Sequence, residues 1–190
     1  ASKADAQHAD SEIAATAIEV TVKGSYLKWD NTQKELVATL MPDTYNTVEN
    51  ANTDVNWSAC TYVVEGEVTM NGNITLNGDV DLIIKDGAKL TVKQIYGSSS
   101  NHNLSIYAQA NQSGQLIVNN SNGNAIYDIP KLEVHSCKVK ATATSSGSIS
   151  YGFSDITTIN VYGGSVDAEN TGDYGSGIKL PLGGSMNIYG

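Results

Sequence analysis

The second half of the chain alternates apolar and polar residues in short stretches that recur at a fixed interval. The stretches Leu132-x-Val134, Ile159-x-Val161 and Met186-x-Ile188 follow one another at intervals of 27 residues, with no gap. Alternation with a period of two is typical of strands. A fixed repeat of roughly 20–50 residues is typical of solenoid proteins. The pattern therefore predicts a coil of strands with about 27 residues in each turn.

The alternation can be followed on three strand segments of each turn. The first segment is apolar at its first and third positions and comprises 82–85, 104–107, 132–135, 159–162 and 186–189. The second comprises 90–92, 116–118, 139–141 and 166–168, and the third is looser, around Ile126, 149–151 and 178–180. Three faces per turn predict an all-β protein, a single-stranded parallel β-helix. Asn-Gly and Asp-Gly pairs between the early strands are also typical of hairpins, so an antiparallel meander is the competing architecture.

The chain divides into three parts on this pattern. Residues 1–17 are rich in Ala, Asp and Ser without periodicity, which is typical of a linker or a frayed terminus. Residues 18–60 contain short strand-like stretches, and we expect them to form an N-terminal β-rich cap, because the first turn of a solenoid exposes an open edge. Residues 61–190 are the predicted β-helix. The pattern stops early in a turn, so we expect further turns or domains after Gly190.

Three segments of this sequence resemble a known family. The segments Tyr62–Val92, Asn103–Gln109 and Ile159–Ser165 resemble secreted or cell-surface, glycine-rich, right-handed parallel β-helix proteins of gut bacteria. The resemblance extends over roughly residues 20–190 and implies a β-helix that is secreted or displayed on the cell surface. Such proteins are described as carbohydrate-binding or adhesin-like. Their Gly-Gly turns are denser than those of this chain, which has Ser136-Cys137 where the next turn has Gly163-Gly164.

Charge and composition narrow the classes of function. The net charge is −9, and all 11 basic side chains are lysines without a basic stripe, which argues against a nucleic-acid partner. No apolar run approaches the length of a membrane span. Cys60 and Cys137 match no metal or redox spacing, so free thiols are favoured and a disulfide stays open. His8, His102 and His135 are scattered, and we expect neither a metal site nor a cofactor.

Two pairs of carboxylates are the candidates for a hydrolytic site. The parallel β-helix is also the fold of pectate lyases and polygalacturonases, but this chain has no arginine and lacks their sequence signatures. Asp79 with Asp81 and Asp167 with Glu169 are spaced about 6.5–7 Å along a strand, within the ~6.5–9.5 Å range of inverting glycosidases. Lys140 lies one turn before Asp167, which predicts a cross-turn ion pair on a solvated face. We therefore assign no catalytic residue and predict that the chain is not an enzyme.

The fourth position of the first strand segment carries the candidate binding residues. It reads Lys85, Tyr107, His135, Tyr162 and Tyr189, four of which are flat rings. Outward rings in a column can stack against sugar faces, or against one another to stiffen the strand face. Tyr107, His135, Tyr162 and Tyr189 are therefore the candidate glycan-binding residues.

Three functions remain, of which the first is favoured. It is a non-catalytic, extracellular structural or adhesion module of a bacterial surface protein. The second is a carbohydrate-binding module that uses the ring column, with a polysaccharide or host glycan as partner. The third is a fragment of a polysaccharide-active enzyme.

Overall fold

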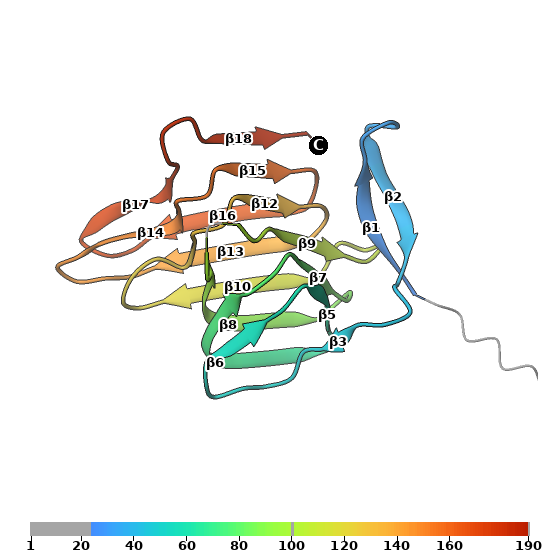
Figure 1. Ribbon diagram of the computed structural model, residues 1–190, viewed down its shortest axis with the longest axis horizontal. Coiled ribbons are helices and arrows are strands. Elements are labelled where there is room, and N and C mark those ends of the chain that lie inside the picture. The colour runs from blue at the N-terminus through green and yellow to red at the C-terminus, as the bar shows by residue number, and fades with distance from the viewer. Residues whose placement is uncertain (1–23, 100, 190) are drawn as a thin grey trace, which may run out of the picture.

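The computed structural model describes residues 24–99 and 101–189, in which every regular element is a strand (Figure 1). The predicted linker at 1–17 and the start of the predicted cap lie outside the described residues. The strands are β1 (Ser25–Asp30), β2 (Glu35–Leu40), β3 (Asn46–Thr47), β4 (Val55–Trp57), β5 (Cys60–Val64), β6 (Glu67–Leu76), β7 (Val80–Ile84), β8 (Lys89–Gly97), β9 (Leu104–Ala108), β10 (Gln115–Asn120), β11 (Ile126–Tyr127), β12 (Lys131–Val134), β13 (Lys138–Ala143), β14 (Ile149–Ser154), β15 (Thr158–Val161), β16 (Ser165–Asn170), β17 (Tyr174–Lys179) and β18 (Ser185–Ile188).

Strands β3 to β18 wind into a solenoid whose strand pairs are parallel. One face is a seven-stranded sheet in the order β18-β15-β12-β9-β7-β5-β3, visible as the stack in Figure 1. Each strand between the two end strands of this sheet pairs with the strand one turn before it and the strand one turn after it. The predicted parallel β-helix is confirmed, and the antiparallel meander is wrong for this part of the chain.

The other two faces form one bent nine-stranded sheet. Its path is β16-β13-β10-β8-β11-β14-β17, with β6 beside β8 and β4 beside β6. The long strand β8 runs round the corner, because its first half pairs with β10 and its second half pairs with β11. The described residues therefore have the three faces per turn that the alternation predicts.

The interior is filled by columns of apolar side chains, one from each turn. Leu132 lies beside Leu104 and Ile159, and Ile159 lies beside Met186, as the repeat predicts. Leu104, Leu132 and Ile159 are fully buried. Each such side chain contributes about 1.5–3 kcal/mol by leaving water. Cross-turn hydrogen bonds join residues 19 or 20 apart near the start and 27 apart later, so the early turns are shorter.

The expected alignment of the first segment is wrong by two residues in β7. Leu104 pairs with Val80 rather than with Leu82, and Tyr107 pairs with Ile83. The alternation of period two fits both registers equally well, so the sequence pattern alone could not separate them. Lys85 therefore lies outside the ring column and forms an ion pair with Glu65 of the preceding turn.

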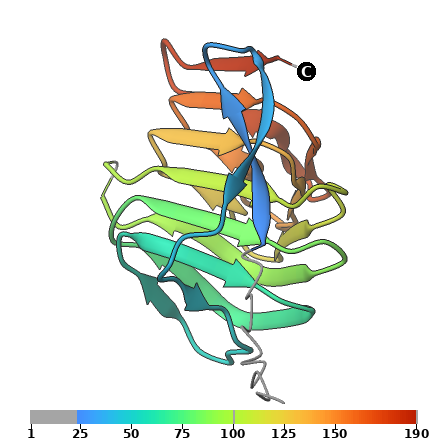
Figure 2. The ribbon, with the colours of Figure 1, turned by 90° about the vertical axis from the view of Figure 1, so that its right-hand side faces the viewer.

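The described part of the predicted cap divides into two structures. Strands β3 and β4 pair in parallel with β5 and β6, so residues 46–57 already belong to the solenoid. Strands β1 and β2 form a separate antiparallel hairpin. Figure 2 shows this hairpin running along the stack, across the outer side of the seven-stranded sheet. It thus covers a flank of the solenoid rather than its first turn.

Candidate functional site

The four predicted binding residues form a continuous stack, here called the aromatic column. Tyr107, His135, Tyr162 and Tyr189 lie on successive turns, at the carboxyl ends of β9, β12, β15 and β18. Their ring centroids are 4.5, 4.8 and 4.8 Å apart along the column, with interplanar angles of 15°, 26° and 24°. Parallel strands in register place one such ring directly over the next, so the stack follows from the repeat.

The hairpin β1–β2 covers the outer side of this column. The ring of Tyr26 meets the ring of Tyr107 edge-on at 4.9 Å. Trp29 stacks on Tyr162 at 5.2 Å and lies tilted against Tyr189 at 5.7 Å. Aromatic pairs in these arrangements add about 0.5–1.5 kcal/mol each beyond the area that they bury.

Three hydrogen bonds join β1 to the solenoid. The backbone N–H of Trp29 donates to Nδ1 of His135 at 3.0 Å. The hydroxyl of Ser136 donates to the backbone carbonyl oxygen of Leu27 at 3.3 Å. The side-chain amide of Gln109 donates to the backbone carbonyl oxygen of Ser25 at 3.2 Å. No strand of the described solenoid pairs with the hairpin. Its attachment therefore depends on side chains of the column and of the residues directly after it.

The rings of the column are buried where the hairpin covers them. Tyr107, His135 and Tyr162 keep only 3%, 4% and 7% of their surface exposed, whereas Tyr189 keeps 50%. Toward the first turn the same outward column continues with Ile83 and Val63, which form a second apolar cluster with Met41, Tyr107 and Tyr26. The surface on which a sugar would stack is thus occupied by the chain itself, except at Tyr189.

Burial and nearby carboxylates raise the pKa of two phenols in the column. For Tyr107, burial is the largest cause of the raised pKa, and the charge of Asp81 adds to it. Asp81 accepts a hydrogen bond from the Tyr107 hydroxyl at 3.2 Å. For Tyr162, burial and Glu133 raise the pKa to about 12. The hydroxyl of Tyr162 donates to Glu133 at 3.1 Å. Both phenols therefore keep their protons and act as hydrogen-bond donors at neutral pH.

Burial also keeps His135 neutral. Burial disfavours the imidazolium form and lowers the pKa of His135 to about 4, although the charge of Glu133 acts in the opposite direction. Since Nδ1 accepts the Trp29 N–H, the neutral ring carries its proton on Nε2. Among the described residues, no group hydrogen-bonds to this buried Nε2.

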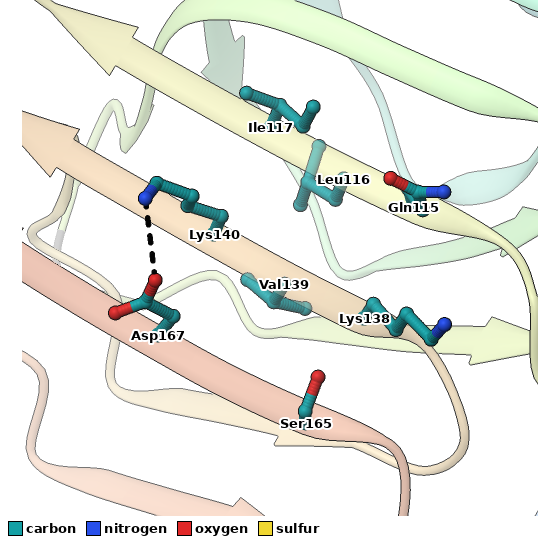
Figure 3. Close-up of a pocket in the computed structure, with 8 residues that line it drawn as sticks. All are labelled: Gln115, Leu116, Ile117, Lys138, Val139, Lys140, Ser165 and Asp167. Atoms are coloured by element: carbon teal, nitrogen blue, oxygen red, sulfur yellow. Dashed lines mark ion pairs between the residues drawn. The ribbon is translucent and has the colours of Figure 1, made fainter.

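The outer side of β10, β13 and β16 is a contrasting candidate surface. A shallow hollow there is lined by Gln115, Leu116, Ile117, Lys138, Val139, Lys140, Ser165 and Asp167 (Figure 3). Lys140 extends along the strand face toward Asp167, at 3.3 Å, and also pairs with Glu169 at 2.9 Å. The predicted cross-turn ion pair between Lys140 and Asp167 is confirmed.

The carboxylates weighed for hydrolysis all have structural partners. Glu169 accepts hydrogen bonds from Lys140 and Thr142, which lower its pKa. Asp79 accepts the backbone N–H of Asn103 at 2.8 Å, and Asp81 accepts the Tyr107 hydroxyl. A general acid for glycoside cleavage needs a raised pKa, so the lowered pKa of Glu169 does not suit that role.

The remaining candidates give no further site in the described residues. Cys60 and Cys137 are both free, and burial raises the pKa of the Cys137 thiol to about 12. No group of three or more His, Cys, Asp or Glu side chains in residues 24–99 and 101–189 could hold a metal ion. The same residues contain no helix with the length and apolarity needed to cross a bilayer.

The residues that sequence reasoning missed are those that cover the column. Tyr26 and Trp29 lie far from it in sequence, and nothing in their local pattern names a partner. One signal was present, because Ile83 is an apolar residue between the inward-facing Leu82 and Ile84, at a position that the alternation predicts to face outward. An apolar residue on the outer side of a sheet indicates that something packs there.

Comparison of this chain with protein-family models, with curated proteins and with solved structures gives no match.

Proposed function

We propose that this chain is a non-catalytic structural or adhesion module of a secreted or cell-surface bacterial protein. The observation that carries the proposal is the covered aromatic column. The rings best suited to hold a ligand are used instead to fasten a hairpin along the solenoid. A stack that links successive turns and a hairpin that crosses them both resist separation of the turns, which suits a stiff surface module.

The charged outer face supports the same proposal. Its side chains bridge neighbouring turns, as Lys140 does with Asp167 and Glu169, rather than converging on one reacting position. The enzyme alternative would require a carboxyl group with a raised pKa beside a free carboxylate. Burial and the charge of Asp155 raise the pKa of Asp128, but Asp155 is itself bound by Ser154 and Lys179. The carbohydrate-binding alternative would require the hairpin to leave the column, or a ligand to use Tyr189 alone or the half-buried stacked pair Tyr96 and Tyr127 on β8 and β11.

Mutation of Tyr162 separates the structural role from glycan binding. We expect Tyr162→Ala to lower the melting temperature by several degrees, because a buried ring leaves the stack. Retention of the full chain on polysaccharide affinity gels is expected to be the same before and after the change. A glycan array and an assay for released reducing ends, both on the unmodified chain, complete the test.

Tyr189→Ala is the matched control, since this ring belongs to the same column but is half exposed. Weaker retention of either variant on a polysaccharide gel, with an unchanged melting temperature, would favour carbohydrate binding instead. Release of reducing ends that is lost in Asp167→Asn would favour the enzyme.

A further inference from the structure

The contact between the hairpin and His135 has the geometry of a proton-sensitive joint. The backbone N–H of Trp29 points at Nδ1 of His135, and the imidazole is held between the rings of Tyr107 and Tyr162. A neutral imidazole offers Nδ1 as an acceptor, whereas an imidazolium carries a proton on both nitrogens. In the charged form, two donors would therefore face each other at 3.0 Å.

The hairpin is a separate sheet that few hydrogen bonds join to the solenoid. It forms its own two-stranded sheet, and its hydrogen bonds to the solenoid come from His135, Ser136 and Gln109. Within the described chain it joins the solenoid through residues 41–45, between β2 and β3. An element outside the hydrogen-bond ladders of the main sheets can open as a separate unit, at a cost set by its side-chain contacts with them.

We propose that the hairpin β1–β2 is an acid-released latch: a proton on Nδ1 of His135 displaces the Trp29 N–H, and the hairpin leaves the aromatic column while the solenoid stays folded.

The charged and titratable groups around His135 favour this direction. Lys28 on β1 and Lys131 on β12 both disfavour a positive imidazole. Glu133 on β12 favours it, but this carboxylate already pairs with Lys131 at 3.0 Å and accepts a hydrogen bond from Tyr162, which directly follows β15. Burial alone would raise the pKa of Glu133, yet these contacts together hold that pKa below its usual value. Tyr107 of β9 presents a neutral phenol whose pKa is raised.

The pH range follows from the pKa of His135 in the two states. With the latch closed the pKa is about 4, and with the hairpin released the ring faces water and returns toward its ordinary value of 6.5. The open state therefore binds the proton more readily, so the closed state is favoured most strongly above pH 6.5 and loses stability as the pH falls to 4. Over this range the ratio of closed to open molecules falls on the order of 100-fold.

Trp29 reports the latch directly. The chain has two tryptophans, and Trp57→Phe leaves Trp29 as the single fluorophore. We expect its emission to shift to the red between pH 6.5 and 4 as the indole leaves Tyr162 for water. The far-UV circular dichroism of the solenoid should stay constant. A Trp29 signal that changes only together with the circular dichroism would overturn the proposal.

His135→Asn is the matched variant. The asparagine oxygen can accept the Trp29 N–H in place of Nδ1 but takes up no proton in this range. Its Trp29 emission is expected to stay constant from pH 6.5 to 4, and an unchanged acid transition would contradict the latch. NMR titration of the unmodified chain needs no substitution: His135 and the Trp29 indole must titrate with one midpoint, and separate midpoints would also refute it.

Discussion

Two outer faces of the same solenoid have opposite surroundings. Outside the seven-stranded sheet, Ile83, Tyr107 and His135 are buried beneath the hairpin. Outside β10, β13 and β16, Lys138 and Lys140 stand in solvent at equivalent outward positions. The strands of both faces are parallel and in register, so the backbone does not distinguish them. The difference lies in the outward side chains and in whether the hairpin packs on them.

This difference can be followed in the strands themselves. All five residues of β9 are buried, whereas buried residues of β13 alternate with residues that are more exposed. A strand covered on both sides loses its polar alternation, because both rows of side chains leave water. Apolar and aromatic residues at successive outward positions therefore mark a covered face of a β-helix, and outward lysines and carboxylates, with only a scattered apolar residue such as Ile117, mark an exposed one.

Truncating a ring under the hairpin is expected to have the largest effect on stability. Tyr107→Ala removes a buried ring that contacts Tyr26 and His135, and it leaves a cavity between the hairpin and the sheet. We expect a loss of about 3–5 kcal/mol in the free energy of unfolding, measured by chemical denaturation.

Tyr107→Phe is the control for that loss. It keeps the ring and removes the hydroxyl that donates to the charged Asp81, so about 1.5–3 kcal/mol is expected. If Tyr107→Ala destabilised the protein no more than Tyr107→Phe, the covered face would not depend on ring packing.

Removing the indole from the hairpin is expected to act locally. Trp29→Ala deletes the contacts with Tyr162 and Tyr189 but leaves the interior columns intact. We expect the free energy of opening of the hairpin to fall by about 1–3 kcal/mol. Hydrogen exchange measures this, because amides of β1 and β2 should exchange faster while those of β12 and β15 stay protected.

Lys28→Ala provides the comparison within β1. Lys28 is exposed on the same strand, and its loss should leave exchange of the hairpin amides nearly unchanged. Faster exchange throughout the solenoid in Trp29→Ala would mean that hairpin and solenoid open as one unit, which would weaken the proposed latch as well.

The repeat in the sequence was sufficient to predict the solenoid but not its covering element. Leu132, Ile159 and Met186 share an interval of one turn, so their register follows from arithmetic on the chain. The contact between Trp29 and His135 joins residues 106 positions apart and repeats nowhere, so no period reveals it. The ring column was predicted, whereas its burial was not, because outward direction alone does not specify solvent.

On the exposed face the smallest effect is expected. Lys140 pairs with Asp167 and Glu169, and all three side chains are at least 36% exposed, so water and salt screen the attraction. Lys140→Ala should leave the denaturation midpoint within experimental error of the unmodified chain in physiological salt, and any residual shift should vanish in 1 M salt, a concentration at which the Debye length is about 3 Å. The glutamate provides a second measure. Hydrogen bonds from Lys140 and Thr142 hold the pKa of Glu169 below its ordinary value, so NMR titration should find that pKa raised in Lys140→Ala. A destabilisation comparable to that of Tyr107→Ala would mean that ion pairs fasten the turns as firmly as the rings do, and the contrast between the two faces would not hold.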